Sequence, residues 1–463
     1  MQKQATEWMR KIDKSGLPGM FKAWIFQHGL LPRLMWPLML YEVPLTTVEG
    51  LERSISSYLR RWFGVPPSFS NIGLYSRTSA LQLPLSLVVE EFKVTKARLV
   101  MTLRDSKDAK IRQAGIQTRT GRKWSASQSV EQAEGVLKHR YIIGATCSGR
   151  QGLGTTHLQM WEGTDDKKKR SMVQGEIRRE EEGATKARAV EMRSQGAWTR
   201  WKLLERKLTW TDLWRYEPLR IQSLLRSVYD TLPSPANLHQ WGLVEEPKCQ
   251  LCQERGTKSH HILSACKTAL TQGRYRWRHD KVLREMAEVL EVERKRKSPP
   301  RKHKPSFIRF VKAGDKGTRT TPGITGILGG AETCEMRVDL GEKLVFPDVV
   351  QTTLRPDVVI WSAESRQIWE ERCDQANERK RAKYVDLMEQ CMERGWCTWL
   401  FPVEVGCRGF PARSVWKMFQ ALGVVGRTRK MVVRRLAEAA ERASCWLWSR
   451  REEKDWKPSI DRQ

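Results

Sequence analysis

The feature that most constrains this chain is a short segment that holds three cysteines and a histidine. Its spacing is Cys-x2-Cys-x8-His-x4-Cys. Three thiolates and one imidazole are a ligand set that suits tetrahedral zinc, and binding the ion would order a loop too small to fold alone. We therefore predict a zinc knuckle whose ligands are Cys249, Cys252, His261 and Cys266.

Two alternatives to this ligand set remain open in the sequence. His260 adjoins His261 and is a rival ligand, and the residues could also be unrelated thiols beside a surface histidine pair. If zinc binds, we expect a structural role, because four protein ligands leave no open position for water. The chain has 10 cysteines in 463 residues, which does not resemble a secreted disulfide framework, so we expect the others to be reduced thiols.

The charge balance points to a polyanionic partner. Lys and Arg number 83 against 53 Asp and Glu, which gives a net charge of +30. Such an excess is typical of proteins that release counterions from nucleic acid. Several of the 20 tryptophans adjoin cations, as in Arg61-Trp62 and Arg276-Trp277-Arg278, which suits phosphate contact combined with base stacking. We expect DNA, RNA or both as partners, although a basic protein that binds neither has the same composition.

The sequence gives no sign of a membrane or secretory segment. The most apolar stretch, residues 20–43, is interrupted by charged residues and prolines, so it lacks the uninterrupted apolar run of a membrane span. No basic, apolar and small-residue succession marks a signal peptide near Met1. We expect no membrane partner and a nuclear or cytoplasmic protein that is not secreted.

The first half of the chain is expected to be helical. Residues 1–148 contain a capping-box pattern, Thr46 to Glu49, followed by apolar residues at helical spacing up to Trp62. A second run, Leu85 to Leu103, indicates another amphipathic helix. We interpret residues 149–196 as a charged linker and residues 197–285 as a helical region that carries the cysteine cluster.

The second half is expected to end in an α/β module. Residues 286–335 are basic and then Gly-rich, which is typical of a disordered linker. In residues 336–463 we predict strands at Leu354–Trp361 and Trp399–Val405 and helices at Glu370–Arg394 and Thr428–Arg450. The predicted fold class is therefore α+β and multidomain, with a helical N-terminal half, a zinc knuckle and a C-terminal α/β domain.

Several segments together resemble the C-terminal half of non-LTR, LINE-type retrotransposon proteins that carry a restriction-like endonuclease. The resembling segments are residues 16–24, 31–33, 229–241, the cysteine cluster, 274–280 and Arg355-Pro356-Asp357. In that family a reverse transcriptase and its thumb precede a helical linker, a zinc knuckle followed by Arg-His-Asp or Arg-His-Asn, and the nuclease. The resemblance covers most of the chain and implies a thumb-like region at residues 1–148 and a restriction-like domain at residues 336–463.

The chain departs from the family in the polymerase. No Tyr-x-Asp-Asp motif occurs, and two-metal phosphoryl transfer needs closely paired carboxylates. We expect no reverse-transcriptase activity from this chain alone, and the missing polymerase portion in a longer product is a possible partner.

A second departure concerns the nuclease, whose family members hold Mg²⁺ between an aspartate and an acid on the next strand. Asp357 supplies the first carboxylate, but the sequence runs from Ile368 directly into what we interpret as a helix, so we predict that the acid-bearing strand is deleted. The remaining candidates for the site are Glu370, Glu371, Lys380, Lys383, Tyr384 and Glu404. Lys380, Lys383 and Tyr384 match a family signature, but a solvated basic helix is an equal interpretation.

The sequence thus predicts a nucleic-acid-binding protein with an impaired nuclease. The resemblance and the local charge point to Arg274, Arg276, Arg278 and His279 as phosphate contacts; packing of this helix start on the knuckle is the alternative. Two other functions stay open, namely a working Mg²⁺-dependent DNA nickase and a host-adopted scaffold protein without catalytic activity.

Overall fold

The computed structural model describes residues 2–147, 161, 163–201, 203–297, 328, 334–341, 343–373 and 377–456. It divides into two compact units: Met1–Trp201 with Glu205–Thr231, and Lys202–Leu204 with Leu232–Gln463. Helices dominate both units and the sheets are small, which confirms an α+β, multidomain chain. Among the described helices, none combines the length and the apolar composition that crossing a bilayer requires.

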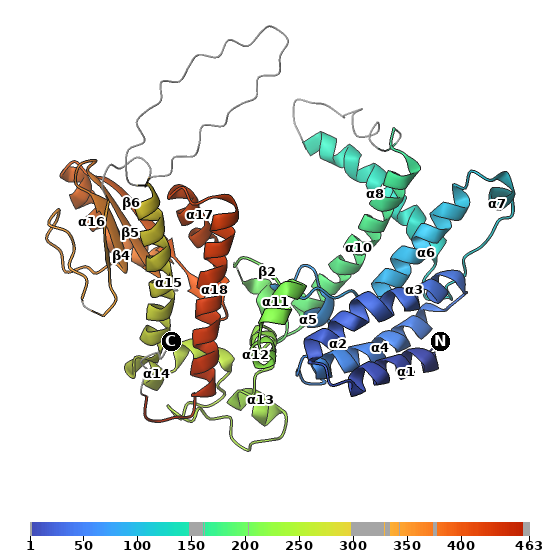
Figure 1. The fold of residues 1–463 in the computed structure, drawn as a ribbon, viewed down its shortest axis with the longest axis horizontal. Helices are drawn as coiled ribbons and strands as arrows, with labels where there is room; N and C mark the ends of the chain where they lie inside the picture. The colour runs from blue at the N-terminus through green and yellow to red at the C-terminus, as the bar shows by residue number, and fades with distance from the viewer. Residues whose placement is uncertain are drawn as a thin grey trace, which may run out of the picture. The chain divides into compact units, whose positions relative to one another are not determined.

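The first unit is almost entirely helical (Figure 1). A short parallel pairing of β1 with β2 joins the middle of this unit to its last segment. Its elements are α1 (Gln2–Lys14), α2 (Gly19–Ile25), the π-helical turn η1 (Phe26–Leu30), α3 (Leu31–Leu40), α4 (Leu45–Trp62), α5 (Asn71–Tyr75), β1 (Leu81–Gln82), α6 (Val88–Arg104), α7 (Ala109–Gln113), α8 (Ala126–Cys147), α10 (Asp166–Glu191), the 3-10 turn η2 (Ala197–Arg200), β2 (Arg206–Lys207), α11 (Trp210–Arg215) and α12 (Pro218–Val228).

Helix α4 confirms one predicted helix but not its predicted start. Val48, Leu51 and Ile55 are buried at helical spacing, as the sequence pattern indicates. The helix begins at Leu45, before the threonines, and has no side-chain cap. Its first amide donates instead to the carbonyl oxygen of Thr120, at 3.0 Å. The capping-box prediction is wrong because the helix starts before Thr46, which therefore lies inside the helix rather than at its N-cap.

Helix α6 depends on a buried carboxylate from α4. Leu87, which precedes it, offers no side-chain cap. Glu52 accepts a hydrogen bond from the amide of Val88 at 2.6 Å and another from the hydroxyl of Ser56 at 2.8 Å. Burial raises the pKa of the Glu52 carboxyl, and these donors oppose the rise. A carboxylate at a helix N-terminus satisfies an orphan amide and suits the helix dipole.

The charged segment predicted as a linker is part of the first unit. Within it, α10 is a continuous helix, and Val173 and Ile177 pack against Val94 of α6 and Val130 of α8. The linker interpretation of residues 149–196 is wrong here, because a few apolar side chains at helical spacing are enough to dock a highly charged helix. The boundary between the two units therefore falls in the sequence after Thr231 rather than at residue 196.

The second unit is built around a four-stranded sheet. Its order is β3-β4-β5-β6, antiparallel except for the parallel pair β5 and β6. Its elements are α13 (Pro235–Gln240), the π-helical turn η3 (His261–Ala265), α14 (Lys267–Thr271), α15 (Arg274–Lys297), β3 (Glu335–Val338), β4 (Val358–Ser362), β5 (Gln367–Cys373), α16 (Asn377–Glu393), β6 (Cys397–Val403), β7 (Val405–Gly406), β8 (Phe410–Pro411), α17 (Arg413–Ala421) and α18 (Gly426–Ser449).

Helices cover both faces of this sheet (Figure 1). Val358 and Ile360 of β4 face a core formed with α15, α17 and α18, and Val359 and Trp361 face a second core with Tyr384 of α16. All five residues of β4 are buried. The central strand therefore reads as a continuous apolar run rather than an alternating one, as expected when helices cover both faces.

Strand β5 corrects the prediction of a deleted strand. Gln367–Cys373 pairs with β4 on one side and β6 on the other, and Glu370 and Glu371 lie within it. The helix predicted from Glu370 begins at Asn377. The Glu-Glu-Arg run favours helix locally, but ladder partners on both sides outweigh that preference.

The predicted linker at residues 286–335 also begins too early. Helix α15 continues to Lys297, and its Leu290 is buried in the sheet core. Most of the basic and Gly-rich stretch beyond it lies outside the described residues.

Replacing Glu52 with alanine tests the long-range cap of α6. We expect Glu52→Ala to lower the free energy of unfolding by about 2 kcal/mol, because it leaves a buried amide without an acceptor. Urea unfolding followed by tryptophan fluorescence measures the change. Glu7→Ala removes an exposed glutamate from its ion pair with Lys11 and should change little. Equal losses in the two variants would contradict the assigned role of Glu52.

Candidate metal centre and adjoining acidic cluster

The cysteines and the histidine of the predicted knuckle come together. The ligand atoms of Cys249, Cys252, His261 and Cys266 all lie within 4.8 Å of one another. The Sγ atoms of Cys249 and Cys266 are 4.0 Å apart, and Cys252 Sγ is 3.2 Å from Nε2 of His261. Zinc with Zn–S bonds of 2.3 Å needs sulfur atoms about 3.8 Å apart, whereas a disulfide needs about 2 Å. The group could therefore hold a metal ion such as zinc.

A tight turn and a short helical turn position these ligands. The Cys249 amide donates to the carbonyl of Glu254, and the Gln253 amide donates back to Cys249, both at 2.9 Å. Gly256 closes the turn at a φ of 68°, which glycine adopts without strain. His261 opens η3 and Cys266 ends it. The rival ligand His260 is exposed and is not part of the group, so the structure selects His261.

A tyrosine from α15 holds the knuckle in place. The Tyr275 hydroxyl accepts from the Cys266 amide at 3.0 Å and donates to the carbonyl of Ile262 at 2.9 Å. Arg278 donates to the carbonyl of Leu263 at 2.6 Å. Burial raises the pKa of the Cys266 thiol to about 11, so a bound metal must displace its proton. Tyr275 was not among the residues predicted from the sequence, although it lies inside a segment that carried the family resemblance.

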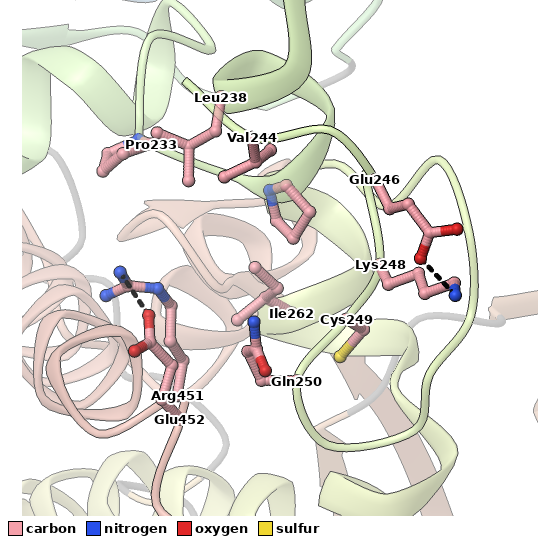
Figure 2. Close-up of a pocket in the computed structure, with 11 residues that line it drawn as sticks. Pro233, Leu238, Val244, Glu246, Lys248, Cys249, Gln250, Ile262, Arg451 and Glu452 are labelled. Atoms are coloured by element: carbon pink, nitrogen blue, oxygen red, sulfur yellow. Dashed lines mark ion pairs between the residues drawn. The ribbon is translucent and has the colours of Figure 1, made fainter. Parts of the chain in front are cut away.

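A small pocket adjoins the first cysteine ligand. Figure 2 shows apolar side chains of Pro233, Leu238, Val244 and Ile262 on its wall. Ion pairs between Lys248 and Glu246 and between Arg451 and Glu452 lie at its rim. Because each of these charges already has a partner, the pocket offers no evident anchor for a charged ligand.

The basic run predicted to contact phosphate is largely engaged within the protein. Arg274 is only 2% exposed, donates to the carbonyls of Arg450 and Glu453 and lies over the Trp456 ring. Arg278 binds the knuckle. Arg274 and Arg278 therefore fit the alternative interpretation, in which the start of the helix packs within the protein. Positions 274 and 278 lie one helical turn apart, on the face of α15 that meets other chain segments.

Arg276 and His279 lie in a cluster with three aspartates, which we call the acidic cluster. Its acids are Asp280, Asp339 and Asp357. Arg276 pairs with Asp280 at 2.8 Å and with Asp339 at 3.0 Å. His279 Nδ1 is 3.1 Å from Asp280, and its Nε2 is 3.4 Å from Oδ1 of Asp357. Burial opposes a charge on His279, but hydrogen bonds to Asp280 and Asp357 outweigh it and raise its pKa to about 9. His279 is therefore an imidazolium at neutral pH.

Asp339 also anchors this cluster and was not predicted from the sequence. Arg355 donates to it at 2.6 Å and the Leu344 amide at 3.0 Å. Burial would raise the pKa of Asp339, but these donors and Arg276 hold it below its usual value. The Asp339 amide donates to the carbonyl of Asp357 at 2.9 Å, which extends the β3–β4 ladder by one pair. No sequence pattern pointed to Asp339.

The predicted nuclease residues gather around the same sheet, though not all their side chains are described. Asp357 is buried directly before β4, and the buried Tyr384 hydroxyl donates to the carbonyl of Arg355 at 3.0 Å. Glu404 lies between β6 and β7 and is half-buried. The side chains of Glu370 and Glu371 in β5, and of Lys380 and Lys383 in α16, lie outside the described part of the structure.

No known family model matches the chain. A comparison with curated proteins likewise finds no match. The site is therefore interpreted from its own chemistry.

Metal analysis tests the knuckle. We expect the purified chain to retain about one zinc ion per molecule, as four closed ligands imply, and Cys266→Ser to lose it. Inductively coupled plasma mass spectrometry measures the content. Cys397→Ser is the matched control, because Cys397 is an exposed free cysteine outside the group. A wild-type chain without metal, or equal loss in the control, would contradict the assignment.

Proposed function

We propose that this chain is a nucleic-acid-binding protein of the retrotransposon type whose second unit nicks DNA with a divalent metal ion. The observation that carries the proposal is the pairing of β4, which follows Asp357, with the acidic strand β5. This strand is the element whose apparent loss pointed to an impaired nuclease. Its presence favours the active alternative.

The strand register supports a two-carboxylate site. Val359 pairs with Glu370, and Val358 pairs with Glu371. Directly opposed positions share a face of the sheet, and successive positions alternate between faces. By this alternation positions 357, 359 and 370 fall on one face and position 371 on the other. Asp357 stands at the end of the strand, where its carboxylate also reaches His279 of α15. Glu370 is the better candidate partner of Asp357.

The donor chemistry fits a hard cation. Carboxylate oxygens are the protein ligands that Mg²⁺ prefers, and Asp357 is buried with one oxygen directed to a cation, His279. When bound, Mg²⁺ would polarise the phosphate and activate a water molecule. His279 and Arg276 keep positive charge beside Asp357 and Asp339, which would also favour an approaching phosphate.

The rest of the chain would supply affinity rather than chemistry. The excess of Lys and Arg gives a sequence-independent attraction to phosphate that weakens with salt. The knuckle would act as a structural element that fixes the start of α15, and through His279 it would reach Asp357. In this proposal, the zinc group and the nuclease site are parts of one assembly.

A second candidate is binding without cleavage. The ion pair between His279 and Asp357 favours it, since the imidazolium already satisfies the carboxylate that a metal would need. A metal ion would have to compete with this pair. Binding alone would then be the retained activity, as the sequence analysis predicts.

Nicking of supercoiled plasmid with Mg²⁺ at low salt separates the two candidates. We expect Asp357→Asn and Glu370→Gln each to lower the nicking rate about 100-fold or more, since even outer-shell changes at metal sites cost 10–100-fold. Glu371→Gln is the matched control, because the register assigns position 371 to the other face of the sheet, and it should keep most of the rate.

The same preparations are titrated on DNA in a gel shift. A wild-type chain that shifts DNA but leaves it uncut would refute the nuclease and leave binding alone. Equal losses in Glu370→Gln and Glu371→Gln, with both variants folded, would refute the register argument.

A further inference from the structure

A group of aromatic rings gathers on the surface of the first unit. Phe21 and Trp24 come from α2, His28 from η1, and Trp210 and Trp214 from α11. The rings of Phe21 and Trp214 are parallel within 4° with centroids 6.2 Å apart. Trp24 lies 6.4 Å from Trp214 and 5.2 Å from His28, and His28 lies 5.6 Å from Trp210. We call these five residues the ring cluster.

The ring cluster is not required to fill the core. In α2 the buried residues are Met20 and Ala23, and in α11 they are Asp212 and Leu213. Their neighbours in the cluster remain open: Phe21 is 38% exposed, Trp24 39% and Trp214 45%. Contiguous exposed aromatic surface on a soluble domain usually marks a binding site.

The exposed charged side chains on the helices that carry the ring cluster are cationic, and one exposed acid, Glu217, follows α11. Between Lys14 and Tyr41 the sequence has no Asp or Glu, and it contains Lys22 and Arg33. On the other side, Arg215 follows Trp214 and is exposed. The acid within α11, Asp212, is buried because it forms a capping box: its carboxylate accepts from the Thr209 amide at 2.9 Å. The exposed charges on α2, η1, α3 and α11 are thus all positive.

We propose that the ring cluster is a stacking platform for single-stranded nucleic acid. Flat exposed rings beside cations bind unpaired bases by stacking while the cations contact the phosphates. The bases inside a duplex cannot stack on such a surface, because they are already stacked on one another. The positive surroundings favour a polyanion over a neutral protein surface. This inference does not rest on the nuclease proposed for the second unit.

The test compares single strands with a duplex. Labelled oligothymidine, oligouridine and a DNA duplex of equal length are titrated with the full chain by fluorescence anisotropy, without divalent metal. We expect Trp214→Ala to bind both single strands about tenfold more weakly, within the range measured for loss of one stacked base. Its duplex affinity should stay unchanged.

Matched variants control for the loss of a tryptophan elsewhere and for misfolding. Trp36→Ala removes a tryptophan from the same unit that is 64% exposed and lies outside the ring cluster, so it should bind as the wild type does. Trp214→Phe should restore most of the affinity, and Phe21→Ala provides a second loss if Trp214→Ala does not fold.

Several outcomes would overturn the platform. An equal loss for duplex, or an equal loss in Trp36→Ala, would show general attraction rather than stacking. Unchanged single-strand binding in folded Trp214→Ala and folded Phe21→Ala would also contradict a stacking role. Loss of self-association or of vesicle binding in Trp214→Ala, without loss of single-strand binding, would assign the surface to another partner.

Discussion

The second unit depends on the attachment of helix α15 to three other segments. Within its first turns, Tyr275 and Arg278 bind the knuckle, Arg274 binds carbonyls beyond the end of α18, and His279 pairs with Asp357 beside the sheet. Further along, Leu283 and Met286 enter the sheet core. Charged side chains near the start of one helix thus connect the metal site, the C-terminal segment and the acidic cluster.

Aromatic rings lie beside cationic side chains in both units, but their roles differ. In the second unit, Trp277 lies 4.7 Å from Trp446, which lies 5.0 Å from Trp456, and Arg274 and Arg450 cover rings of this group. These contacts hold the structure together. In the first unit, Phe21, Trp24 and Trp214 of the ring cluster remain exposed. Sequence alone cannot separate the two cases, because both have tryptophan beside arginine.

The sequence predicted the features that depend on local spacing. The intervals between Cys249, Cys252, His261 and Cys266 were enough to predict that they come together, and the helices α4, α6 and α18 were also predicted and are present. The prediction failed where contacts with distant segments determine the local structure. Strand β5 exists because β4 and β6 flank it, α4 is capped from a loop, and Arg274 is buried by segments far along the chain.

The central claim is that the knuckle and the acidic cluster form one assembly through α15. Hydrogen–deuterium exchange before and after zinc chelation tests it most directly, because exchange reports local opening. We predict faster exchange in residues 249–266, in the first turns of α15 and in β4, with α4 of the first unit unchanged. Faster exchange confined to residues 249–266 would contradict the claim.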